Sequence, residues 1–345
     1  MIAALSTLCP NLQHIIFDGL PRDPVITAAV SGLLLTINRN ILQHFWVDSP
    51  LFEGAREVIY KLPGLRKLRT IIDGPTVLPT LVLPSLIELS IEYDGGHDWL
   101  QGFRGASLGK LTSVSIHSDS DSIDDFLGEF ESVALTTSIP ATLLEFTFYT
   151  SSAWRPNYRS LLPFTHLKKL DLDFLCELEC SSTMDDDTII DLARAMPELE
   201  TLRYGDRLCQ TPVGVTTKGL AALAHCCVRL YELRIHFQVA SLDPPEVPNF
   251  AYIDERSFPL GDCALTDLDV GNSDIPEASV LMVALTLLRI FPRLNWIEHG
   301  GEGWEKVANA IGLSSDLADY SSKKLIFATP RCAVDDPSPG SSIRR

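Results

Sequence analysis

The sequence predicts an α/β solenoid, in which short parallel strands stack into one concave sheet and irregular helices lie on its convex side. Three observations predict this fold. A short apolar strand motif recurs along the chain, proline precedes many of these motifs at a fixed distance, and several intervals between motifs have the length and pattern of a helix. A strand this short cannot bury its apolar side alone, so each unit needs stacked neighbours.

The most complete unit runs from Thr216 to Phe237. It begins with an apolar helical pattern over Gly219–His225. Leu230, Leu233 and Ile235 then follow in the spacing L-x-x-L-x-I. A helix, a turn and a short strand in this order are the signature of one leucine-rich repeat.

Eleven motifs of the form L-x-x-[apolar]-x-[apolar] are spaced 21 to 35 residues apart. Their first leucines are Leu12, Leu42, Leu65, Leu86, Leu111, Leu143, Leu167, Leu199, Leu230, Leu265 and Leu294. The fourth position is apolar in every motif, and the sixth fails only at Thr70 and His299. Because a solenoid grows by adding neighbours, the motifs predict one repeat domain over residues 1–313.

Proline stands two residues before the first leucine in five of the motifs. These prolines are Pro10, Pro63, Pro84, Pro197 and Pro292. Proline cannot continue a helix and favours extended geometry in the residue before it. Each of them therefore predicts the end of a helix before a strand.

The longer intervals have room for helices. The expected helices are Val25–Ile37, Ile123–Phe130, Ile189–Met196, Gly219–His225, Ala278–Phe291 and a terminal cap over Trp304–Ile311. Their starts carry acidic residues or proline, which are N-terminal helix signals; Asp185–Asp187 are one such cap. Residues 314–345 are predicted to be a C-terminal extension that is disordered from about residue 330.

The irregular spacing, the proline cue and the unit G-L-A-A-L-A-H-C-C-x-x-L-x-x-L-x-I resemble the leucine-rich-repeat half of fungal F-box proteins, which is akin to the ribonuclease-inhibitor-like horseshoe. The resemblance covers roughly Ala3 to Gly312. It implies a horseshoe fold and a role in substrate recognition for a ubiquitin ligase. In that family an N-terminal F-box docks the cullin-ligase adaptor. The first repeat begins so near Met1 that we expect no F-box in this chain. We therefore expect the cullin-ligase adaptor to bind only a form of the protein that carries an N-terminal F-box.

Composition limits the partners. The net charge of −17 argues against nucleic acid and anionic membranes, which are bound by Lys and Arg, and favours a protein partner with a basic surface. The longest apolar stretch, Ala278–Phe291, falls short of the roughly 20 residues of a membrane-spanning helix. The eight cysteines are scattered and no secretory signal precedes them, which predicts free thiols in a cytoplasmic or nuclear protein.

Side chains alternate across a strand, so the third, fifth and seventh positions of each motif are expected to line the concave face. The predicted partner-binding residues there are Trp46, Asp48, Glu92, Tyr149, Asp171, Asp173, Arg203, Glu232, Arg234, Asp267, Asp269 and Trp296. Other polar residues at these positions, among them Asp18, Arg69, His117, Lys169, His236 and Glu298, are expected on the same face. For any single position, a solvated polar face without a ligand is an equally good interpretation.

Within this set, the aromatic residues can act as anchors for a partner. Asp171 with Asp173 and Asp267 with Asp269 form two acidic pairs that can receive Lys or Arg. The loop Val239–Cys263, in the widest interval between motifs, is expected to contribute to the same binding surface.

Catalytic motifs are missing from the sequence: it contains no G-x-S-x-G, no G-x-x-x-x-G-K-[ST] and no H-E-x-x-H. We therefore expect a non-enzymatic interaction scaffold without catalytic, cofactor or metal sites. Three alternatives remain open. They are a free-standing or inhibitor-like binding protein without a ligase link, a metal-binding or catalytic protein that uses the Cys176 to Asp187 region, and a decayed repeat protein without a defined ligand.

Overall fold

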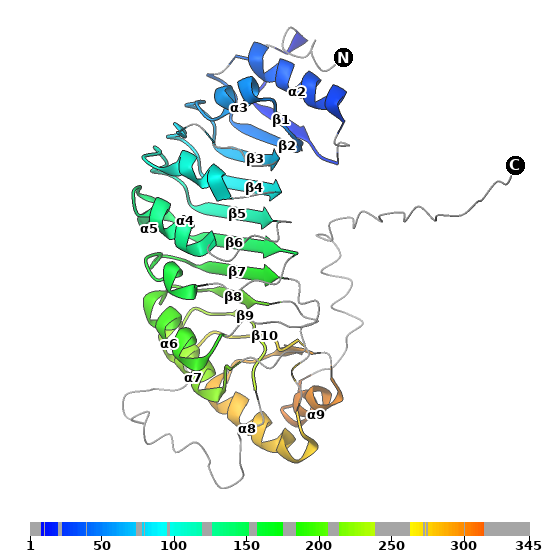
Figure 1. Cartoon of the computed structure of the whole chain (residues 1–345). Helices are drawn as coiled ribbons and strands as arrows, with labels where there is room; N and C mark the ends of the chain where they lie inside the picture. The colour runs from blue at the N-terminus through cyan, green and yellow to red at the C-terminus, as the bar shows by residue number, and fades with distance from the viewer. Residues whose placement is uncertain are drawn as a thin grey trace, which may run out of the picture.

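The computed structural model describes residues 8–9, 11–19, 23–38, 40–73, 78, 80–94, 97–118, 126–151, 157–174, 184–205, 214–238, 263–271, 273, 275–299 and 301–313. Within this part of the chain, eleven strands form one parallel sheet, and their order in the sheet is their order in the sequence. Figure 1 shows the strands stacked as a ladder along the length of the molecule, with helices α3 to α8 along one side of it. The α/β class and the single parallel sheet of the predicted solenoid are thereby confirmed.

Each predicted motif supplies one strand. The strands are β1 His14–Phe17, β2 His44–Pro50, β3 Lys67–Asp73, β4 Glu88–Asp94, β5 Ser113–Ser118, β6 Glu145–Thr150, β7 Lys169–Phe174, β8 Thr201–Tyr204, β9 Glu232–Arg234, β10 Asp267–Asp269 and β11 Trp296–Glu298. Equivalent motif positions pair across the ladder, as Leu202 does with Leu233 and Leu233 with Leu268. The register shifts once, between Trp46 and Pro50 of β2.

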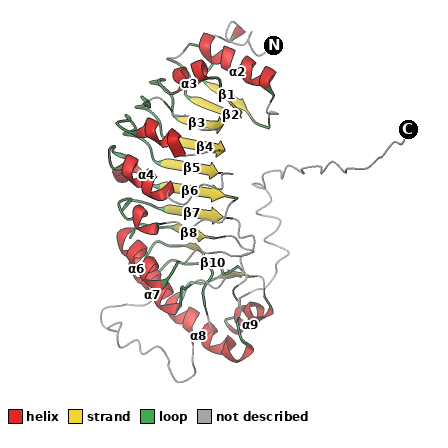
Figure 2. Cartoon of the chain, viewed as in Figure 1, coloured by secondary structure: helices red, strands yellow, loops and turns green. Residues whose placement is uncertain are grey.

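The helices lie in the intervals where the sequence has room for them (Figure 2). They are α2 Pro24–Thr36, α3 Glu53–Ile59, α4 Phe126–Ala134, α5 Ile139–Thr142, α6 Asp186–Ala195, α7 Thr217–Cys226, α8 Val280–Ile290 and α9 Glu302–Ala310, with 3-10 turns η2 His97–Phe103, η3 Tyr158–Leu161 and η5 Glu277–Ser279. Asp23 caps α2 by accepting from the Val25 amide at 2.7 Å.

All six expected helices are present, but none has the expected bounds, and α3 and α5 were not expected. α2, α6, α7 and α9 begin one to three residues earlier than expected, and two other helices differ in further ways. The helix expected over 278–291 begins as a 3-10 turn at Glu277 and is α-helical only from Val280. The helix expected over 123–130 continues to Ala134, because Phe130, Val133 and Ala134 extend its buried stripe. Its first three expected residues lie outside the described part.

The core lies between the sheet and the helices. The fourth and sixth motif positions point into it, so that Phe146 and Phe148 of β6 are fully buried. Phe126 of α4 stacks on Phe148 with ring centroids 4.8 Å apart, and Phe130 stacks on Phe164 at 5.5 Å. Aromatic pairs of this kind add to the free energy gained by burial alone.

Several predictions fall on residues outside the described part of the chain. These are the extension 314–345, the loop residues 239–262, and Cys176, Cys180 and Cys209. Cys9, Cys226, Cys227 and Cys263 are described, and their thiols are free. Among the described helices, none is long and apolar enough to cross a membrane; the longest, α2, has 13 residues.

Candidate binding face

The third, fifth and seventh motif positions lie on the sheet face that points away from the core, which we call the open face. β2 shows the alternation clearly, since its residues are buried and half-buried in turn. Of the twelve predicted partner-binding residues, Asp171, Arg234 and Asp269 are buried, and Trp46, Asp48, Glu92, Tyr149, Asp173, Arg203, Glu232, Asp267 and Trp296 are half-buried. None of the twelve is fully exposed.

A group of connected charged contacts joins β7, β8 and β9. Arg203 donates from Nε and Nη2 to Glu232 Oε1, at 2.9 and 2.6 Å, and from Nη1 to Asp171 Oδ2 at 3.4 Å. Desolvation alone would lower the pKa of Arg203, but the carboxylates of Glu232 and Asp171 outweigh it and raise that pKa above its usual value. The guanidinium is therefore held in one orientation and permanently charged.

Arg234 lies next to this pair and is only 8% exposed. Its Nη2 donates to Asp171 Oδ1 at 3.3 Å and to Asp173 Oδ2 at 3.2 Å. Asp171 thus bridges two arginines on successive strands. We call these five residues, Asp171, Asp173, Arg203, Glu232 and Arg234, the central charge network.

The sequence places arginines beside an acidic pair, but it does not show which groups bind each other. The pairing follows from the parallel register, in which Asp171, Arg203 and Arg234 occupy the same motif position on adjacent strands. Strands about 4.8 Å apart bring side chains of this length into direct contact.

At the C-terminal side of the network, His236 is 5% exposed and its ring lies directly over Gly271. A Cβ at Gly271 would come within 2.0 Å of His236 Nε2, and the backbone there has φ +54°. Only glycine satisfies both the conformation and the space. The sequence alone gives no signal for this requirement beyond the presence of glycine.

The N-terminal end of the open face has its own cluster. The Arg69 guanidinium lies over the Trp46 ring, with Cζ 4.5 Å from the ring centroid. Asp48 Oδ1 is 3.3 Å from Arg69 Nε and accepts from Trp46 Nε1 at 3.1 Å. A hydrogen bond to Asp48 and the negative charge of that carboxylate raise the pKa of the neighbouring Asp18.

In the middle of the face, the seventh positions of β4 to β7 form a row. Glu92 is in register with His117, His117 with Tyr149, and Tyr149 with Asp173. The His117 and Tyr149 rings are in contact in a tilted arrangement, with centroids 4.2 Å apart and 40° between the ring planes. Tyr149 is therefore a half-buried aromatic that lies between His117 and Asp173.

At the C-terminal end, Asp267 is in register with Trp296, and Asp269 with Glu298. Asp267 Oδ2 accepts from Thr266 Oγ1 at 2.7 Å, and Asp269 Oδ1 accepts from the Gly271 amide at 3.0 Å. Of the two predicted acidic pairs, Asp171 and Asp173 bind arginines, and the contacts of Asp267 and Asp269 include these hydrogen bonds from Thr266 and Gly271.

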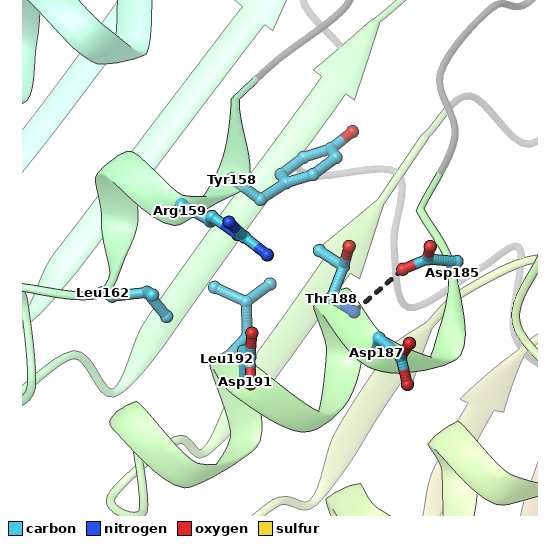
Figure 3. Close-up of a pocket in the computed structure, with 8 residues that line it drawn as sticks. All are labelled: Tyr158, Arg159, Leu162, Asp185, Asp187, Thr188, Asp191 and Leu192. Carbon is cyan, nitrogen blue, oxygen red and sulfur yellow. Dashed lines mark hydrogen bonds between the residues drawn. The ribbon is translucent and has the colours of Figure 1, made fainter.

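A separate small cavity of about 170 Å³ lies on the helix side, between η3 and α6. It is lined by Tyr158, Arg159, Leu162, Asp185, Asp187, Thr188, Asp191 and Leu192 (Figure 3). Asp185 Oδ1 accepts from the Thr188 amide at 2.8 Å, and hydrogen bonds from Thr188 lower the pKa of Asp185. The predicted role of Asp185 as a helix cap is confirmed.

The neighbouring Asp186 joins α6 to α7. Its Oδ1 accepts from the amides of Thr216 and Gly219 at 2.8 and 2.9 Å, and its Oδ2 accepts from Thr216 Oγ1 at 2.6 Å. A Cβ at Gly219 would lie 2.7 Å from Asp186 Oδ1, so glycine is needed there. Asp187, by contrast, is exposed and contacts Lys218 Nζ at 3.2 Å.

We expect Asp186→Ala to lower the free energy of unfolding by about 2 kcal/mol, because hydrogen bonds to a charged group are among the stronger ones. Asp187→Ala removes the same side chain one residue on and should cost less than about 0.5 kcal/mol, as an exposed ion pair does. Urea unfolding of both variants, followed by circular dichroism, measures the difference. Equal losses would contradict the role given to Asp186.

The described residues contain no group of three or more His, Cys, Asp or Glu side chains arranged to hold a metal ion. Of the Cys176 to Asp187 region, the structure describes only Met184 to Asp187. Its three aspartates cap α6, hold the start of α7 and pair with Lys218.

In comparisons with known proteins, no family model matches the chain and no curated protein sequence matches it.

Proposed function

We propose that this chain is a leucine-rich-repeat solenoid with a horseshoe curvature that binds a protein partner through its open face and performs no catalysis. Two features support the repeat assignment. Each of the eleven motifs supplies one strand of the sheet. The motif leucines, such as Leu199, Leu230 and Leu265, are buried where each strand begins.

The central charge network is the observation that best supports a binding role. Two arginines and three carboxylates are fixed there on adjacent strands by hydrogen bonds of 2.6 to 3.4 Å. Side chains that are already ordered lose little further conformational entropy when a partner binds. Rigid strands also place polar groups more accurately than loops do.

The partner is proposed to have a basic surface. From β7 to β11 the open face holds six carboxylates, Asp171, Asp173, Glu232, Asp267, Asp269 and Glu298, against three cations, Lys169, Arg203 and Arg234. The chain as a whole has a net charge of −17. Complementary charge speeds association and selects among partners more than it adds affinity.

The resemblance to fungal F-box proteins leads to a narrower proposal, in which the solenoid recognises substrates for a ubiquitin ligase in the cytoplasm or nucleus. A free-standing binding protein without a ligase link is the alternative. Recovery of the cullin-ligase adaptor with a form extended upstream, where the gene encodes one, would support the ligase role. Recovery of other proteins without the adaptor would support the free-standing role.

The test of the open face compares two Tyr→Ala variants in affinity capture followed by mass spectrometry. Tyr149 lies on the open face, whereas Tyr231 is 45% exposed and precedes β9, outside the face. Tyr149→Ala should weaken capture of the partner by about tenfold or more, as the loss of an aromatic anchor does. Tyr231→Ala should leave capture unchanged.

Thermal unfolding of both variants shows whether each one is still folded. An unchanged melting temperature would mean that weaker capture comes from the lost contact and not from unfolding. Partner capture that survives Tyr149→Ala but is lost with Tyr231→Ala would contradict the proposal.

A further inference from the structure

Helix α8 is apolar on the side that faces solvent as well as on the side that faces the core. The residues buried against the core are Val283, Ala284, Leu287 and Ile290. The exposed apolar residues, each between 38 and 63% exposed, are Leu281, Met282, Leu285 and Leu288. A helix that is apolar all round is normally buried on every side. The solvent side of α8 therefore has the composition of an interface.

The spacing of these exposed residues suits contact with another helix. Leu281, Leu285 and Leu288 are four and three residues apart, which is the spacing at which the side chains of two packed helices interlock. Met282 lies beside them on the same side of the helix. Figure 1 shows α8 at the C-terminal end of the row of helices along the ladder. We call the four exposed residues the α8 seam.

The charges at the two ends of the α8 seam complement each other. Glu277 lies before the seam and Arg293 after it, and both are exposed. Glu277 Oε1 is 2.6 Å from Lys306 Nζ, yet the Glu277 side chain is 83% exposed and has room for a second cation. Glu277 precedes Leu285 by eight residues, and Arg293 follows it by eight. Two α8 helices that pack antiparallel about a two-fold axis at Leu285 would therefore place Glu277 of each copy towards Arg293 of the other.

We propose that the α8 seam is the contact between two copies of this chain, which pack their α8 helices antiparallel. Leu285 meets its own copy at the axis, and Met282 of each copy faces Leu288 of the other. Charge favours this surface as well. A chain of net charge −17 repels its copy, whereas α8 contains no acidic residue.

The size of the seam sets the strength of the dimer. Four apolar side chains and two ion pairs bury less surface than a stable dimer needs, so we expect a dissociation constant on the order of 10⁻⁵ M. Unfolding measured well below this concentration reports the monomer. The seam lies on the helix side of the sheet, so this inference is independent of binding by the open face.

Sedimentation velocity of the full chain over a concentration series tests the seam. Leu285→Glu brings two like charges together at the axis and should weaken the dimer at least tenfold. The matched control, Leu135→Glu, makes the same change at a residue that follows α4 and is 57% exposed, and it should change the dissociation constant less than twofold. Circular dichroism shows that both variants are folded. A chain that stays monomeric, or a dimer that is unaffected by Leu285→Glu, would overturn the proposal.

Two charge reversals test the antiparallel arrangement. Glu277→Arg and Arg293→Glu each place like charges at both ends of the seam, so each variant alone should dimerise about fivefold more weakly. An equal mixture of the two variants should form a heterodimer about as tight as the unaltered dimer, because both end contacts then join an arginine and a glutamate. Two variants that associate no better together than alone would contradict this pairing and overturn the proposal.

Discussion

Replacing Leu233 with alanine is expected to lower the free energy of unfolding by about 2 to 5 kcal/mol, the range for truncating a buried leucine. Leu233 is 0% exposed and lies at the centre of β9. It is in register with Leu202 on one side and Leu268 on the other, so the cavity left by the missing atoms would be walled by neighbouring units. Urea unfolding followed by circular dichroism measures the loss.

Leu281→Ala is the matched control. It makes the same change on α8 at a residue that is 63% exposed, and it should alter stability by no more than about 0.5 kcal/mol. If both variants lose the same amount, the strand register that places Leu233 in the core is wrong. Repeats interact mainly with their neighbours, so the chain can unfold in several steps. In that case Leu233→Ala should lower the urea concentration of the step that contains β9 before it affects the other steps.

The sheet could be predicted because one physical rule repeats. A short strand must bury every second side chain, and Leu230, Leu233 and Ile235 show that pattern in the sequence as plainly as in the structure. Register followed from the same leucines, since a shift by one residue would turn the apolar side to solvent. Thr70 broke the pattern yet is fully buried, because its neighbours on both sides of the ladder set the position of the strand.

Contacts between units were not predictable to the same degree. The alternation rule placed Asp171 and Arg234 on the open face, but their burial depends on the exact partners across β8. The contacts of Asp186 with the start of α7 depend on two helices 30 residues apart in the sequence. Such pairings require the distance between units, which a single repeat pattern does not contain.

Gly271→Ala is expected to lower the free energy of unfolding by about 2 to 5 kcal/mol, the sum of a strained backbone and an overpacked contact. Gly271 has φ +54°, and a Cβ there would lie 2.0 Å from His236 Nε2. The imidazole cannot easily turn aside, because the residue is only 5% exposed. Thermal unfolding of the variant measures the loss, and the displaced ring should also disturb the neighbouring central charge network.

Two further variants separate the two causes. Gly19→Ala meets a similar φ of +65° with no atom within 4 Å of the new Cβ, so it should cost only about 1 to 2 kcal/mol from the backbone. In a double-mutant cycle, His236→Ala removes the ring that the new Cβ would strike. The double variant should then lose about 1 to 3 kcal/mol less stability than the sum of the losses of the two single variants. A coupling energy near zero would mean that the His236 ring moves away from the new Cβ without cost. That result would contradict the close contact between His236 and Gly271.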